Sequence, residues 1–323
     1  MRKLTGMAWL KKHIAKLEFT TSEFQNQIAA IKSIEPEICN EFHPWTPLKL
    51  VLLNYALDTC TTIIRNKKQL FKRMYCVDLF AGSGINKLKG TKDFLIGSPF
   101  IATFKYGKDY DLFYFCENDA KLCAALKKRL NTVNQSNIQI LSEDCMDCLD
   151  GILQVTNKPN NYAFFFVDPF FLEFEWSAMK KVLHTQEGKL IGRDILFTFM
   201  SGEIMRFVGL AKKGKSEGMK LNNFFGDDSW KNITTIESAV ELYKNKILQE
   251  IPYTVVRTIK IKSKKHGFCY HLFFITNKTQ GNTPWIKAID RAKQEIEKNS
   301  DKSVEMALNI IKKRQAELAN FLK

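Results

Sequence analysis

The chain has 323 residues, 45% of them hydrophobic, which is ample for one large or two modest globular cores. No apolar run approaches the ~20 residues of a membrane helix, and the basic start of the chain lacks the apolar stretch of a secretory signal, so we expect a cytoplasmic protein with no membrane contact. The net charge of +15 predicts a surface that attracts polyanions such as nucleic acid.

Residues 1–70 carry a helical pattern of apolar residues, which is clearest from Pro47 to Ile64. Thr46 is a suitable N-cap for that helix, and Pro47 suits its first position. We therefore expect an N-terminal helical region at 1–70.

From Met74 onward strands and helices alternate, which is typical of βα units and a mainly parallel sheet. The expected strands are Met74–Phe80, Leu112–Glu117, Ile138–Ser142, Ala163–Asp168 and Asp194–Met200. The expected helices are Ser98–Lys105, Ala120–Leu130, Cys145–Val155, Trp176–His184, Ile204–Ala211 and Thr235–Glu250. Two later runs, Tyr253–Lys262 and Phe268–Thr276, predict an antiparallel hairpin at the sheet edge.

Five βα units followed by a hairpin match the α/β, Rossmann-like order of class I methyltransferases, which use S-adenosylmethionine (SAM). The same count also suits other doubly wound folds. We expect this domain to span 71–280, followed by a C-terminal helical extension at 281–323 that is helical from about Pro284 to Leu322.

The segment after the first predicted strand suits a loop that binds a nucleoside cofactor, because ligands of such sheets lie at the carboxyl ends of the strands. Glycines there let the backbone turn tightly and approach the ligand. The expected contacts are Asp78, Phe80, Gly82, Ser83 and Gly84. Asp78 can meet the amino-acid moiety of SAM. A plain strand-to-helix turn is the alternative, and a dinucleotide loop is excluded because position 87 is Lys.

Acidic residues also follow the next two predicted strands. Glu117, with Asn118 beside it, is placed to bind the ribose hydroxyls. More residues than usual separate Glu117 from the glycine loop, because Asn86–Ile96 is interpreted as an inserted loop. Ser98 is expected to be the N-cap of the helix that follows this loop. Asp144 is placed either to bind the adenine amino group or to cap the helix that follows it, and both roles stay open.

The predicted catalytic residues are Asp168, Pro169 and Phe170. An aromatic amine is a poor nucleophile because its lone pair is delocalised into the ring. Hydrogen bonds from its N–H groups to the Asp168 carboxylate and the Pro169 carbonyl would localise the lone pair for attack on the SAM methyl group, so Asp168 also borders the cofactor. Phe170 or Phe171 would stack on the base. The alternative is a purely structural role, because an Asp at the end of a strand, followed by a turn that begins with Pro, is also common.

Basic residues are partly clustered. No Asp or Glu occurs from Ile251 to Ile289, and we expect Lys262, Lys264 and Lys265 of that stretch to bind nucleic acid, together with Lys49. Two further clusters lie at 65–73 and 212–220. A solvated basic surface is the alternative.

Eight cysteines suit a reducing compartment. Cys145 and Cys148 form one CxxC, but no second CxxC or paired His completes a zinc site, so no metal is expected. Ordinary reduced thiols are the favoured interpretation, and a redox pair is the alternative.

The ordered set of motifs resembles the three-Cys-motif partner (TcmP) family of methyltransferase-like proteins over roughly positions 45–290. The matching segments are Trp45-Thr46-x-x-Lys49-Leu50, Val77–Gly82, Gly97–Pro99, the strand ending in Glu117, Glu143–Cys145, Phe166–Phe170 and Tyr270–Asn277. The resemblance implies SAM binding and a partner protein with a three-cysteine motif, similar to radical-SAM enzymes. The family commonly has Pro where this chain has Ser83 and Gly where it has Phe171, and Phe171 would narrow the target pocket.

The Asp-Pro-Phe element is also similar to that of tRNA guanine dimethyltransferases, which modify an exocyclic amine. The sequence thus predicts a SAM-dependent methyltransferase acting on an exocyclic amino group of a nucleobase in DNA or RNA. The alternative is a non-catalytic SAM- or nucleoside-binding partner subunit of another enzyme or defence complex. An open pocket beside Asp168 would favour catalysis, and a pocket plugged by Phe171 or by the N-terminal helix would favour the alternative.

Overall fold

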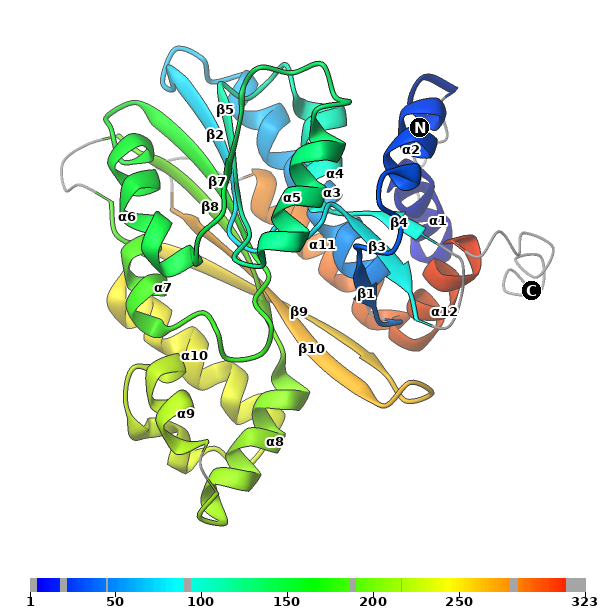
Figure 1. The fold of residues 1–323 in the computed structure, drawn as a ribbon. Helices are drawn as coiled ribbons and strands as arrows, with labels where there is room; N and C mark the ends of the chain where they lie inside the picture. The colour runs from blue at the N-terminus through cyan, green and yellow to red at the C-terminus, as the bar shows by residue number, and fades with distance from the viewer. Residues whose placement is uncertain are drawn as a thin grey trace.

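A seven-stranded sheet in the order β6-β5-β2-β7-β8-β10-β9 forms the centre of the molecule (Figure 1). The computed structural model describes residues 5–17, 22–44, 46–89, 94–185, 190–215, 217–278 and 284–311. The strands are β2 (Arg73–Asp78), β5 (Leu112–Cys116), β6 (Ile138–Leu141), β7 (Asn161–Val167), β8 (Gly192–Phe199), β9 (Thr254–Ser263) and β10 (Phe268–Asn277). Five parallel strands precede the hairpin, in which β10 pairs antiparallel with both β8 and β9. The predicted Rossmann-like class I methyltransferase fold is confirmed.

The central strands are apolar along their whole length because helices cover both faces of the sheet. All seven residues of β7 are buried, and successive side chains enter different cores. Phe164 and Phe166 pack into the core on one face, whereas Ala163 and Phe165 pack into the core on the other.

Two sets of helices cover the two faces. The core on one face is shared by α3 (Thr46–Arg65), α4 (Ser98–Tyr106), α5 (Ala120–Leu130), α11 (Pro284–Lys298) and α12 (Ser300–Ile311), and also by α1 (Gly6–Leu17), which packs on α3, α11 and α12, and α2 (Ser22–Ser33). The other packs against α6 (Cys145–Thr156), α7 (Trp176–Leu183), α8 (Ser201–Lys212), α9 (Gly218–Phe225), the 3-10 turn η1 (Asp228–Asn232) and α10 (Ile236–Glu250). The helices from both ends of the chain thus share a core with the central sheet. Within the described ranges, no helix is both long and apolar enough to cross a bilayer.

A second, three-stranded sheet lies beside the glycine loop, in the order β1-β3-β4. Its strands are β1 (Asn40–Phe42), β3 (Ile85–Leu88) and β4 (Phe94–Ile96). The prediction of a loop at Asn86–Ile96 is therefore wrong, and so is the expectation that 1–70 is helical throughout. β1 pairs with β3 more than forty residues along the chain, whereas β3 and β4 pair locally, and strands of three or four residues are too short for their own sequence pattern to reveal them.

Other predicted boundaries are also corrected. Gly97, not Ser98, occupies the N-cap of α4, because the helix already includes Ser98 at its first position. The expected C-terminal helix is two helices, α11 and α12, and its residues 312–322 lie outside the described part of the chain, as does Trp45. Helix α9 and the η1 turn were not predicted.

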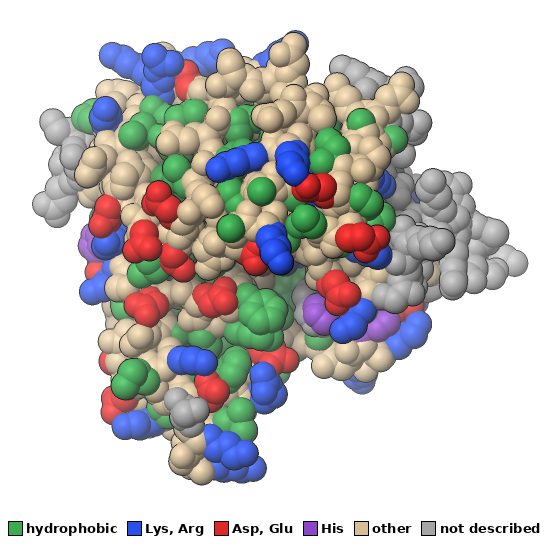
Figure 2. Space-filling model, viewed as in Figure 1, with side chains coloured by type: hydrophobic (Ala, Val, Ile, Leu, Met, Phe, Trp, Pro, Cys, Tyr) green, Lys and Arg blue, Asp and Glu red, His purple; other side chains and the backbone are tan. Residues whose placement is uncertain are grey.

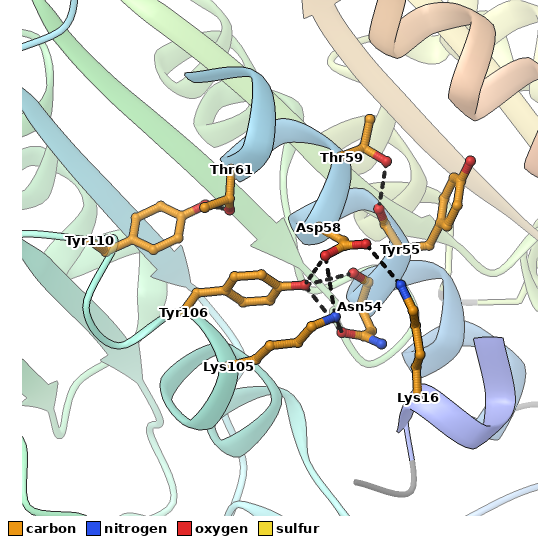
Figure 3. A network of polar contacts seen from close by, with 9 residues as sticks. All are labelled: Lys16, Asn54, Tyr55, Asp58, Thr59, Thr61, Lys105, Tyr106 and Tyr110. Atoms are coloured by element: carbon orange, nitrogen blue, oxygen red, sulfur yellow. Dashed lines mark hydrogen bonds and ion pairs between the residues drawn. The ribbon is translucent and has the colours of Figure 1, made fainter. Parts of the chain in front are cut away.

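A polar network ties the N-terminal helix to the rest of the molecule (Figure 3). Asp58 of α3 pairs with Lys16 of α1 at 3.2 Å and with Lys105 of α4 at 3.3 Å. The Tyr106 hydroxyl donates to the same carboxylate over 3.4 Å. Burial by itself would raise the pKa of Asp58, but the two ammonium groups outweigh it and lower that pKa.

Candidate functional site

The loop after β2 requires glycine at two positions. Gly82 and Gly84 have φ angles of 63° and 80°, in the left-handed region that favours glycine. A Cβ on Gly82 would lie 2.5 Å from Asn40 Oδ1, and one on Gly84 would lie 2.5 Å from the Phe100 ring. The loop runs directly into β3, and the N-terminus of α4 returns to it, where the Gly97 N–H donates to the Gly84 carbonyl over 2.7 Å.

A cavity of about 490 Å³ opens at the carboxyl ends of the parallel strands, where the strand order reverses between β2 and β7. The predicted site residues among those that line it are Lys49, Phe80, Gly82, Gly84, Glu117, Asn118, Asp168, Pro169, Phe170 and Phe171. Residues from Asn40 to His43 form another wall. The structure therefore joins the glycine loop and the Asp168 segment in one cavity.

Glu117 stands between this cavity and a smaller one of about 40 Å³. Burial raises the pKa of its carboxyl, and hydrogen bonds from the backbone N–H groups of Asp119 and Gly82 act in the opposite direction. The Asp119 N–H lies 2.8 Å from Glu117 Oε1. The carboxyl is thus held at the end of β5, with one side facing the cavity.

Asp144 caps α6, because its carboxylate accepts a hydrogen bond of 2.8 Å from the Met146 N–H. The capping alternative is therefore confirmed. Asp144 also lines the smaller cavity with Glu143 and Glu173, so its contact with adenine stays a prediction.

The side chains of Asp78 and Ser83 are buried and do not line the cavity. Asp78 is 2% exposed, and its Oδ1 accepts from the Phe80 N–H, whereas Oδ2 has no hydrogen-bond partner in the described part of the chain. Burial raises the pKa of this carboxyl to about 7, against the opposing effects of the Ser98 hydroxyl and the Phe80 N–H. Ser83 is fully buried, and its hydroxyl donates to the Ile85 carbonyl. Direct contact of either residue with a cofactor stays a prediction.

Lys49 of α3 pairs with the predicted catalytic carboxylate. Its Nζ lies 2.5 Å from Asp168 Oδ2, and the two side chains are only 11% and 19% exposed. The sequence predicted a substrate contact for Lys49 but not this partner. The ion pair leaves Oδ1 of Asp168 as the oxygen not engaged by Lys49.

Two aromatic rings follow Asp168 at the cavity mouth. Phe170 is 65% exposed, and its ring centroid lies 4.1 Å from that of Phe171. Phe171 has a φ of 61°, which is strained for a residue with a side chain. Glycine would adopt this φ without a steric penalty.

The basic clusters lie apart from the cavity wall. Lys262, Lys264 and Lys265 belong to the β9–β10 hairpin and are absent from the cavity lining; the Lys265 ammonium pairs with Glu305 at 2.7 Å. Their contact with a substrate stays a prediction. The exposed cluster at 65–73 precedes β2 and lies at its amino end, whereas the cavity lies at the carboxyl ends of the strands. Figure 2 shows Lys and Arg side chains at the top and bottom of the viewed face, and acidic side chains interspersed with further Lys and Arg across its middle.

Sequence reasoning missed Asn40, Met200 and Glu203, which also line the cavity. A signal existed for the last two, because Met200 follows β8 directly and Glu203 lies in the first turn of α8. No local signal marks Asn40, which reaches the site through strand pairing.

The structure places the two sulfurs of the CxxC segment among different neighbours. Cys148 Sγ lies 3.0 Å from Cys116 Sγ on β5, so its sulfur contact lies outside the motif, and all eight cysteines are free thiols. Among the described residues, no group of three or more His, Cys, Asp or Glu side chains could hold a metal ion.

No family model matches the chain, and no curated protein matches it. Protein LPL1258 of Legionella pneumophila str. Philadelphia 1, of family DUF519, is 14% identical with a TM-score of 0.46 over 73% of this chain and 88% of that one. An O-methyltransferase from Bacillus cereus in complex with SAH is 8% identical with a TM-score of 0.45, over 84% and 97% of the chains. An rRNA methylase from Streptococcus thermophilus is 11% identical with a TM-score of 0.37, over 69% and 93%. The TcmP resemblance stays a prediction.

Proposed function

We propose that this chain binds SAM and transfers its methyl group to an exocyclic amino group of a nucleobase in DNA or RNA. The observation that carries the proposal is the cavity of about 490 Å³ that joins the glycine loop and Glu117 to Asp168, Pro169 and Phe170. The cavity is open beside Asp168, and Phe171 lines it without closing it, which favours catalysis over a purely structural partner subunit.

The cofactor half of the cavity suits SAM. The glycine backbone at Gly82 and Gly84 forms a cradle that a Cβ would obstruct, and Glu117 offers a carboxylate to the ribose hydroxyls. The smaller cavity, which Asp144 lines, adjoins the larger one at Phe80, Glu117 and Asn118, so Asp144 would lie near the adenosine part of a cofactor held by Glu117. When bound, SAM supplies an electrophilic methyl group on a sulfonium.

The target half of the cavity suits an aromatic amine. Asp168 Oδ1 and the Pro169 carbonyl would accept the two N–H groups of the amine, while Lys49 holds Oδ2 in place. This arrangement localises the amine lone pair and directs it toward the cofactor half. The exposed ring of Phe170 would stack on the base.

Nucleic acid is the substrate class that best accounts for the charge. The chain carries a net charge of +15. Lys262, Lys264 and Lys265 lie at or next to the turn that joins β9 to β10, and this turn is at the same end of the sheet as the cavity. Binding through such lysines would weaken steeply with added salt.

Calorimetric titration with SAM and SAH tests the cofactor half. We expect Glu117→Ala to abolish or strongly weaken binding, and Asp168→Ala to leave it nearly intact. Asp150→Ala is the matched control, because Asp150 lies outside both cavities and pairs with Lys181 on the exposed surface. Absence of binding by the folded wild-type protein would overturn the proposal.

Transfer of tritiated methyl groups from SAM to RNA and DNA from cells that lack this protein tests the target half. We expect transfer by the wild type and none by Asp168→Ala. SAM binding without transfer to either nucleic acid would instead favour the partner-subunit alternative, with the three-cysteine partner implied by the TcmP resemblance as the protein to add.

A further inference from the structure

Arg129, in the last turn of α5, is fully buried and holds two segments that are distant in sequence. Its Nη1 donates to the carbonyl of Ser83 in the glycine loop over 2.6 Å. Its Nη2 lies 2.8 Å from each of the carbonyl oxygens of Ile34, Glu35 and Ile38. The acceptors of this guanidinium within the described ranges are thus backbone carbonyls of the loop and of the turn between α2 and β1.

Burying this guanidinium is costly, and burial lowers the pKa of Arg129. Arginine suits the position because its planar fork presents five donors at once, so one side chain can bind both segments. A lysine has three donors on one nitrogen and cannot span the same acceptors. The requirement is therefore specific to arginine and not simply for a positive charge.

The turn that Arg129 holds is itself strained. Glu35 has a φ of 44°, and such a backbone persists only where the surroundings enforce it. The preceding residue of α5, Lys128, forms an ion pair with the Glu35 side chain. Adjacent residues of one helix thus secure the backbone and the side chain of Glu35.

The turn continues into β1, which completes the link to the glycine loop. Asn40 Oδ1 accepts the Ser83 N–H over 2.8 Å and would lie only 2.5 Å from a Cβ on Gly82. Ser83 is therefore held at its N–H by Asn40 and at its carbonyl by Arg129. The glycines on either side of Ser83 are the ones that line the cavity.

We propose that Arg129 is a positioning residue for the cofactor loop, and that the segment 34–42 is a working part of the cofactor site. Arg129 does not line the cavity, so it acts through the loop backbone. This inference rests on the proposed function for the ligand, but the restraint on the loop exists without ligand.

The test compares Arg129→Lys with Arg193→Lys. Arg193 is the matched control, because it is also buried and also donates to a backbone carbonyl, that of Val182 at 2.7 Å, but packs on the opposite face of the sheet. We expect both variants to melt at lower temperature. Only Arg129→Lys should raise the dissociation constant for SAM. The increase is about tenfold if the loop adopts its binding conformation in a tenth of the molecules.

The KM for SAM should rise in Arg129→Lys while kcat stays near the wild-type value, a split that general destabilisation would not produce. Equal dissociation constants for SAM in the two arginine variants would overturn the inference. If Arg129→Lys does not fold, Asn40→Ala tests the other end of the link and should also weaken SAM binding.

Hydrogen exchange of the ligand-free protein separates this inference from the proposed function. In Arg129→Lys, the amides of 34–42 and of the loop 79–85 should exchange faster together, with no change in Arg193→Lys. If the wild type binds no SAM, the proposed function fails, and the exchange result alone decides whether Arg129 restrains the loop. Unchanged exchange in both segments would overturn the restraint.

Discussion

Replacing Lys49 with Met removes the partner of the predicted catalytic carboxylate without changing the length of the side chain greatly. The two groups are 2.5 Å apart and at most 19% exposed, so Asp168 would lose a partner that solvent cannot fully replace. Because the pair is only partly buried, we expect the free energy of unfolding to fall by about 1–3 kcal/mol, below the ~3–5 kcal/mol of a fully buried pair.

The effect on catalysis should exceed the effect on stability. Without Lys49 the carboxylate can rotate, and a displacement of about 1 Å at a reacting group costs roughly 100-fold in rate. We therefore expect kcat to fall by about 100-fold in Lys49→Met. The dissociation constant for SAM should change little, because Lys49 lines the cavity beside Asp168, in the proposed target half.

The assay is methyl transfer from tritiated SAM to nucleic acid, with calorimetry and thermal melting on the same samples. Lys246→Met is the matched control: Lys246 pairs with Asp227 at the same 2.5 Å, is 13% exposed, and belongs to α10, away from the cavity. It should lower stability without changing kcat. A Lys49→Met protein with wild-type kcat would refute the positioning of Asp168 by Lys49.

Three further predictions concern other parts of the structure. Burial raises the pKa of Asp78 to about 7 from a usual 3.8, so the folded state holds a proton that the unfolded state releases, and the free energy of unfolding should fall as pH rises through this window. Urea titrations should show a steeper fall in the wild type than in Asp78→Asn, and equal slopes would contradict this. Asp58→Asn leaves Lys16 and Lys105 without their shared carboxylate and should cost about 1 kcal/mol, seen as a lower melting temperature; an unchanged melting temperature would contradict this. Phe171→Gly relieves about 1 kcal/mol of left-handed strain, which offsets lost ring contacts, so stability should stay near wild type while the KM for nucleic acid changes; a large loss of stability would show that ring packing dominates.

The fold class, and the end of the sheet at which the candidate site lies, follow from local patterns in the sequence. Buried parallel strands are continuous apolar runs, so β2, β5 and β7 are visible without tertiary information. Residues just after such strands must meet at one edge, and for this reason Gly82, Glu117 and Asp168 could be assigned to a common cavity.

The residues that support that cavity come together only when the chain folds. Asn40 and Arg129 contact Ser83 across long stretches of chain, and Lys49 contacts Asp168 from α3, which comes before the first strand of the central sheet. These contacts depend on strand pairing and on the directions of side chains, which have no periodic signature in the sequence. The sequence shows that residues 65–73 are basic, but the fold decides at which end of the sheet this charge lies. It lies at the amino end of β2, away from the cavity.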